Sequence, residues 1–160
     1  TYVTMNPTAD EIVSIALQAR DHLKRFGIEA RAALLSYSNF GSREGDTSEK
    51  MQVAYQKLKQ VAPDLIVEGE MQGDLALNQQ LRERYIPDTV LKGEANLLVF
   101  PNLESANLSM TLLKEMNNAL PVGPILMGTQ RPAHILAPSV TSRGIVNMTA
   151  IAVSEALAME

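Results

Sequence analysis

The sequence contains no cysteine and only two histidines among its 160 residues. The absence of cysteine excludes disulfides, thiolate nucleophiles and cysteine-ligated zinc or iron–sulfur sites. With His22 and His134 alone, a histidine-rich metal site is excluded as well. No apolar run approaches the roughly 20 residues that cross a bilayer, and no signal-peptide pattern stands at the amino terminus. Nothing here suggests secretion, and we expect a cytoplasmic protein.

Basic residues are outnumbered by acidic ones, 14 to 18, and the formal net charge is −4. A nucleic-acid-binding surface is normally basic, and the overall balance gives no sign of one. No polybasic run points to an anionic membrane surface. We therefore expect neither nucleic acid nor a membrane among the partners. Because the chain begins with Thr1 rather than Met, we also expect a fragment or processed product.

The chain has the length of one domain and an ordinary globular composition, 46% hydrophobic and 20% charged. Amphipathic helical segments alternate with short, continuously apolar runs, which are typical of strands buried on both faces. A Thr8–Glu11 capping box marks the first helix, and Asp74 is expected to cap the third. The helices are expected near 8–26, 46–62, 74–86, 103–118 and 141–158, and the strands near 32–37, 65–67, 96–100 and 122–127. This pattern predicts a three-layer α/β/α fold with a mostly parallel sheet.

Ligands of open α/β sheets gather beyond the carboxyl ends of the strands. Three polar loops are expected there, at 36–43, 68–74 and 100–107. The first loop combines hydroxyls, an amide, a glycine and an arginine, which suits a phosphate cradle of backbone N–H groups and hydroxyls. The alternative is a solvated loop with a turn at Gly41. The candidate ligand residues in this loop are Ser36, Ser38, Asn39, Gly41, Ser42 and Arg43.

The other two loops allow both binding and structural roles. Glu68, Glu70 and Asp74 offer carboxylates to a hard cation, but a helix cap at Asp74 and an arginine ion pair at Glu70 are the stronger expectations. We therefore assign no metal site. Asn102 stands before a helix, where it either favours an anion or caps the helix. His134 is expected to be packed and hydrogen-bonded, and no Ser-His-Asp or paired-carboxylate arrangement stands out.

Four motifs stand in order along the chain: LLSYSNFGS at 34–42, EGEMQGD at 68–74, KGEANLLVFPNL at 92–103 and VGPILMG at 122–128. Together they resemble the phosphate acetyl/butyryltransferase family. The resemblance runs from about Pro7 to the carboxyl end and matches the second half of a unit about twice as long. It implies the fold of isocitrate/isopropylmalate dehydrogenases, with residues 1–130 as the second subdomain and residues 131–160 returning to the first.

Two further segments, Ser-Asn-Phe-Gly-Ser at 38–42 and Ile-Val-Asn-Met-Thr-Ala at 145–150, are similar to the carboxyl-terminal acyltransferase-like domain of bacterial NADP-dependent malic enzymes. This similarity implies an idle domain that serves oligomerisation and acetyl-CoA sensing. It implies no cofactor in this domain, with NADP and a divalent metal (Mg or Mn) in an upstream malic domain. The expected partners are a second copy in a homodimer or higher oligomer, that upstream domain, and acetyl-CoA. Asn96, Asn102 and Asn107 join the first-loop residues as candidate contacts to acetyl-CoA or phosphate.

Three positions separate an idle domain from an active one. In the active family, which moves acetyl between CoA and phosphate, a Ser-Arg pair contacts the reacting groups and an Asp is the proposed base. Aligned without gaps from Arg131-Pro132, the pair falls on Ala137 and Pro138, and the Asp falls on Gly144. Losing all three groups leaves little chemistry. If the Ser-Arg pair were instead aligned with Ser142-Arg143, the match that begins at Ile145 would be lost. We therefore favour a regulatory domain over two alternatives, half of an active acyltransferase and a purely structural dimerisation module.

Overall fold

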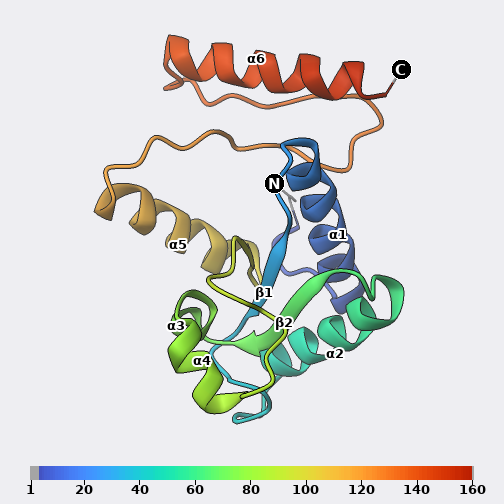
Figure 1. Ribbon diagram of the computed structural model, residues 1–160. Helices are drawn as coiled ribbons and strands as arrows, with labels where there is room; N and C mark the ends of the chain where they lie inside the picture. The colour runs from blue at the N-terminus through green and yellow to red at the C-terminus, as the bar shows by residue number, and fades with distance from the viewer. Residues whose placement is uncertain (1–3, 160) are drawn as a thin grey trace. The chain divides into compact units, whose positions relative to one another are not determined.

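The computed structural model describes residues 4–159, which form two compact units divided after residue 108. The first unit contains α1 (Ala9–Arg25), β1 (Arg31–Leu35), α2 (Asp46–Val61), β2 (Ile66–Met71), α3 (Gly73–Leu77), α4 (Gln79–Tyr85) and β3 (Leu97–Val99) (Figure 1). Helix α5 (Leu103–Met116) runs into the second unit, which also holds α6 (Ser142–Leu157). Within residues 4–159, no helix combines the length and apolar character that a membrane crossing needs. The subdomain boundary expected at residue 130 concerns the larger family unit and stays a prediction.

Three parallel strands form the sheet in the order β2-β1-β3. Side chains of β1 alternate between two apolar clusters, as the pleat of a strand requires. Ala32 and Leu34 pack with residues of α1 and α2, whereas Ala33 and Leu35 pack with residues of α3 on the other face (Figure 1). The sheet is therefore covered on both sides, which confirms the predicted three-layer arrangement.

Local polar side chains fix where the helices begin. The predicted capping box is present, because Thr8 N–H donates to Glu11 Oε2 (2.8 Å) and Glu11 N–H donates to Thr8 Oγ1 (3.3 Å). The single helix expected over 74–86 is wrong, since α3 and α4 are separated at Asn78. The Asn78 Oδ1 atom accepts from Leu81 N–H (3.0 Å), and such local capture of a backbone donor competes with a continuous helix. Asp74 lies inside the first turn of α3 rather than at its cap.

The strand expected over 122–127 is not formed, and this prediction is wrong. Among the described residues, strands cover only β1, β2 and β3, and the segment from 119 to 140 has neither helix nor strand. Pro124 has no N–H to offer a ladder, and Gly123 has a φ of +137° that a strand does not use. Regular structure resumes at Thr141, whose Oγ1 accepts from Gly144 N–H (3.1 Å) and caps α6.

Candidate functional site

The first loop, residues 36–43, leaves the carboxyl end of β1 and is held against the end of β2. Ser36 N–H donates to the Met71 carbonyl (2.9 Å), and Phe40 N–H donates to the Glu70 carbonyl (2.8 Å). Ser36 Oγ in turn accepts from Ser38 N–H (3.2 Å). Two neighbouring strands therefore position the loop beyond their carboxyl ends, where ligands of α/β folds bind.

Glu70 and Ser38 form the buried centre of this loop. Glu70 is 1% exposed, and its Oε1 accepts from Ser38 Oγ (2.9 Å) and from Gly41 N–H (2.8 Å). Ser38 is fully buried, and its Oγ also accepts from Arg43 N–H (3.1 Å). Among residues 4–159, no arginine or lysine pairs with Glu70, so the expected arginine ion pair is wrong. Because Ser38 is enclosed, its hydroxyl fixes the shape of the loop.

Asn39 joins the first loop to the residue that follows β2. Its Oδ1 accepts from Gln72 N–H (2.7 Å), and its Nδ2 donates to Gln72 Oε1 (3.2 Å). Gln72 Nε2 donates back to the Tyr37 carbonyl (2.7 Å), and Ser42 Oγ accepts from Asn39 N–H (3.0 Å). The structure thus brings the six candidates of the first loop together. Glu70 and Gln72, which hold the loop, were not predicted as its partners.

Glu68 lies within β2 and belongs to a buried network rather than to an open loop. Its Oε2 accepts from Thr89 Oγ1 (2.7 Å) and Val90 N–H (2.9 Å), and its Oε1 accepts from Tyr55 Oη (3.4 Å). Burial, together with the Glu68 carboxylate, raises the pKa of Tyr55. The described residues contain no group of three or more acidic or histidine side chains arranged to hold a metal ion.

The third loop follows β3. Asn102 caps α5, because its Oδ1 accepts from Ser105 N–H (2.8 Å) and its carbonyl accepts from Ser105 Oγ (3.0 Å). Lys50 of α2 reaches this end of the sheet and donates to the Pro101 carbonyl (2.7 Å), and burial lowers the pKa of Lys50. No sequence signal distinguished this lysine. Asn107 lies further along α5 and is exposed.

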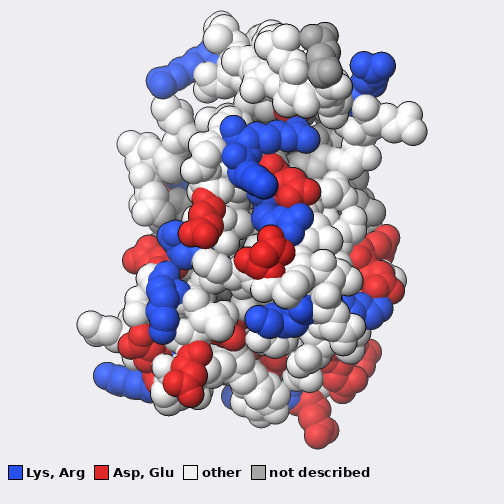
Figure 2. All heavy atoms as spheres, turned by 45° about the vertical axis from the view of Figure 1, so that its right-hand side comes forward, with Lys and Arg blue, Asp and Glu red and all other residues white. Residues whose placement is uncertain are grey.

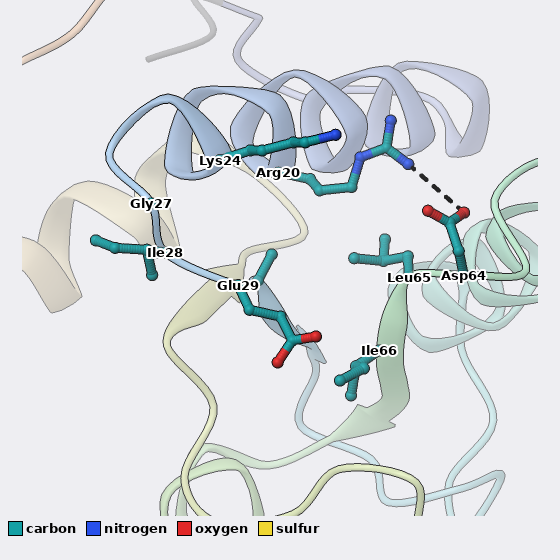
Figure 3. Close-up of a pocket in the computed structure, with 9 residues that line it drawn as sticks. Arg20, Lys24, Gly27, Ile28, Glu29, Asp64, Leu65 and Ile66 are labelled. Carbon is teal, nitrogen blue, oxygen red and sulfur yellow. Dashed lines mark ion pairs between the residues drawn. The ribbon is translucent and has the colours of Figure 1, made fainter.

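Asn96 lies apart from the other candidates, at the amino end of the sheet. Its Oδ1 accepts from Arg31 N–H (2.7 Å), and its Nδ2 donates to the Glu29 carbonyl (2.9 Å). A pocket of about 380 Å³ opens at this end, where Arg20 Nη1 lies 4.0 Å from Asp64 Oδ1 (Figure 3). None of the candidate residues lines this pocket. Figure 2 shows acidic and basic side chains interspersed on the face that it draws.

In the second unit, Gly144 is closely packed. Gly144 lies in the first turn of α6, and a Cβ atom there would lie 2.7 Å from Val140 Cγ2. An aspartate at this position would therefore require Val140 to move. Ala137 and Pro138 precede this turn, and the Ala137 carbonyl accepts from Val140 N–H (3.0 Å).

His134 is packed and hydrogen-bonded, as predicted. Its side chain is 4% exposed, its Nε2 lies 3.2 Å from Glu155 Oε2, and its Nδ1 accepts from Leu126 N–H (3.4 Å). Nδ1 has the hydrogen-bond partner, while Nε2 only lies close to the Glu155 carboxylate of α6, so His134 links the irregular segment to this helix.

Residues 1–153 match the family model described as phosphate acetyl/butaryl transferase. The chain belongs to this family. The resemblance carried by the four ordered motifs is therefore confirmed. Among solved structures, a phosphotransacetylase from Streptococcus pyogenes superimposes with a TM-score of 0.93 at 29% identity, over 98% of this chain and 48% of that one. The predicted α/β fold of this family is confirmed by the match to this phosphotransacetylase.

The family members most similar in sequence include malic enzymes. The chain is 55% identical to an NAD-dependent malic enzyme of Rhizobium meliloti (strain 1021) over 97% of its length, and 48% identical to an NADP-dependent malic enzyme of Escherichia coli (strain K12) over 98%. It spans 20% and 21% of those enzymes. It is also 34% identical to the phosphate acetyltransferase of Bacillus subtilis (strain 168), over 97% of this chain and 48% of that enzyme.

Proposed function

We propose that this chain is a non-catalytic, phosphate acetyltransferase-like domain of a malic enzyme, which oxidatively decarboxylates malate to pyruvate. The observation that carries the proposal is the match of nearly the whole chain to about a fifth of two malic enzymes. NADP and a divalent metal then belong to an upstream malic domain, and a cytoplasmic location stays a prediction. The relatives include malic enzymes named for NAD and for NADP, so the choice of nicotinamide cofactor is part of the proposal.

Loss of acetyl transfer is supported by three positions. By resemblance, Ala137 and Pro138 stand where the active family has its Ser-Arg pair, and Gly144 stands where it has its Asp. The crowding of Val140 against position 144 adds to this argument, because a base does not fit there without rearrangement. A positioned base and an electrostatic stabiliser each contribute on the order of 10²–10⁴-fold, so an enzyme without them turns over little.

Acetyl-CoA binding is proposed at the carboxyl end of the sheet, with regulation as its consequence. Arg43 is exposed on the first loop, and a guanidinium grips phosphate oxygens bidentately. Asn102 and Asn107 lie after β3, where amides can contact the pantetheine arm. For regulation, acetyl-CoA must bind two states of the parent enzyme with different affinities, and a coupling of about 1–3 kcal/mol suffices.

Calorimetry and activity assays on the full-length protein test this proposal. We expect acetyl-CoA to bind and to change the rate of malate decarboxylation, and we expect no acetyl phosphate to form from acetyl-CoA and phosphate. Arg43→Ala should weaken acetyl-CoA binding about tenfold, which is the loss of one charge-assisted contact. Arg84→Ala, an exposed arginine on α4, is the matched control and should bind normally.

Each contrary result has a distinct meaning. Acetyl phosphate formation that disappears in Ser142→Ala would show that a displaced Ser-Arg pair is active and that the chain is half of an acyltransferase. If the wild-type protein binds no acetyl-CoA, the domain is a structural module. If Arg43→Ala and Arg84→Ala bind acetyl-CoA equally well, the first loop is not the site.

We also propose that the domain takes part in a homodimer or higher oligomer. Residues of α5 present a markedly exposed apolar surface, and Leu112 and Met116 are 60% and 81% exposed. A two-fold contact is the commonest way to cover such a surface. Sedimentation at roughly tens of micromolar protein, a concentration well above the dissociation constants typical of obligate dimers, should show an oligomer. A double Leu112→Lys, Met116→Lys variant should be a monomer under the same conditions. Glu115→Lys on the same helix is the charge control, and a wild-type monomer would contradict the proposal.

A further inference from the structure

The backbone donors of the first loop are already used within the protein. Each N–H from residue 38 to residue 43 has an acceptor inside the chain: Ser36 Oγ, Ser42 Oγ, the Glu70 carbonyl, Glu70 Oε1, the Asn39 carbonyl and Ser38 Oγ, in that order. These distances lie between 2.8 and 3.2 Å, within the normal range for such bonds. A ligand phosphate therefore meets a loop whose amides are occupied.

The anion that this loop holds is Glu70. A buried charge must be compensated by donors or by an opposite charge. Among the described residues no cation pairs with Glu70, and its Oε1 instead receives Ser38 Oγ–H and Gly41 N–H. Donation to an ionised acceptor is the stronger kind of hydrogen bond. The carboxylate thus takes one backbone donor of the loop, Gly41 N–H, together with the Ser38 hydroxyl.

We propose that Glu70 is a specificity-determining residue of the first loop, because its buried carboxylate, bonded to Ser38 and Gly41, repels a phosphate group from this loop. The loop then serves an uncharged part of the ligand, and a phosphate is left to the exposed Arg43 guanidinium on the outside. This inference rests on the proposed acetyl-CoA site and names the ligand chemistry of one part of it.

Removal of the charge should weaken the repulsion that a phosphate group meets at the first loop. A second negative charge placed a few ångströms from a buried carboxylate is strongly repelled, because the effective dielectric constant there is far below that of water. Gln in place of Glu70 keeps the acceptor atom for Ser38 and Gly41 but removes the charge. We expect Glu70→Gln to bind inorganic phosphate at least about tenfold more tightly than the wild-type protein.

The experiment measures inorganic phosphate binding to the full-length wild type, Glu70→Gln and Glu44→Gln by calorimetry. Glu44 is exposed beside the same loop, so Glu44→Gln makes the same charge change without touching the cradle and should bind like the wild type. A folded Glu70→Gln variant that binds phosphate no more tightly than Glu44→Gln would overturn the proposal.

Hydrogen exchange on the wild type keeps the test independent of whether Glu70→Gln folds. Amides of residues 38–43 should exchange slowly in the absence of ligand, and inorganic phosphate should not slow them further. Fast exchange that phosphate suppresses would show that the cradle is open to anions, which contradicts the inference. Absence of acetyl-CoA binding refutes the proposed function alone, because the phosphate comparison and the exchange result still decide the role of Glu70.

Discussion

Replacing Arg82 with methionine should lower the free energy of unfolding by about 3–5 kcal/mol. Arg82 of α4 is fully buried, although arginine is rarely enclosed in proteins. Its Nη1 donates to the Leu75 carbonyl (2.6 Å), and its Nη2 donates to the carbonyls of Leu91 (2.6 Å) and Gly93 (2.7 Å). Methionine has a similar length but no donor, so these carbonyls would remain buried and unpaired.

The charge of Arg82 is compensated mainly by the dipoles of the carbonyl groups that it contacts, and indirectly by the Glu68 carboxylate through Thr89. Arg82 Nε donates to Thr89 Oγ1 (3.3 Å), and Thr89 Oγ1 donates to Glu68 Oε2 (2.7 Å). Burial lowers the pKa of Arg82, and the nearby Glu68 and Glu83 carboxylates act in the opposite direction. Arg82 therefore joins α3, α4 and the 89–93 segment to β2, the strand that carries Glu70.

Denaturant unfolding of Arg82→Met beside Arg84→Met measures this effect. Arg84 lies on the same helix but is exposed, and its substitution should change the free energy of unfolding by no more than about 0.5 kcal/mol. Equal stabilities for the two variants would mean that the buried carbonyls find other donors or water. In that case Arg82 would be dispensable to the fold.

Arg82 also marks a limit of prediction from the sequence. The segment Gln79–Tyr85 contains two arginines, and the polar pattern around them is typical of a solvated helix. Nothing local distinguishes Arg82 from Arg84, because burial is decided by the chain that returns over α4 near Gly93. Helix ends with a local cause were predictable, as the Thr8 capping box shows.

The candidate site was predictable to the extent that it follows from topology. Residues that follow parallel strands lie at the same end of the sheet, so the first loop and the residues after β2 were expected to lie together. Asn96 precedes its strand and consequently lies at the opposite end. The partnership of Glu70 with Ser38 could not be predicted, because it depends on which way one side chain of β2 points. The strand expected over 122–127 failed because apolar composition alone does not supply a ladder partner.

Gly69→Ala should cost about 3 kcal/mol, a sum of backbone strain and steric overlap. Gly69 of β2 pairs with Leu34 of β1 and has a φ of +145°, which L-residues other than glycine rarely adopt. A Cβ atom there would lie 2.8 Å from the Leu34 carbonyl oxygen and 2.9 Å from Leu34 Cβ. Neither atom can move without shifting β1, so the two strands must separate locally.

Two other glycines separate these causes. Gly93 has a φ of +75° with nothing within 4 Å of an added Cβ, so Gly93→Ala should show the backbone strain alone, about 1 kcal/mol. Gly73 has neither feature, and Gly73→Ala should be close to neutral. Denaturant unfolding of the three variants should therefore rank Gly69→Ala as the most damaging. If Gly69→Ala costs no more than Gly93→Ala, β1 and β2 are not in rigid contact. The first loop, which depends on both strands, would then be less fixed than its hydrogen bonds indicate.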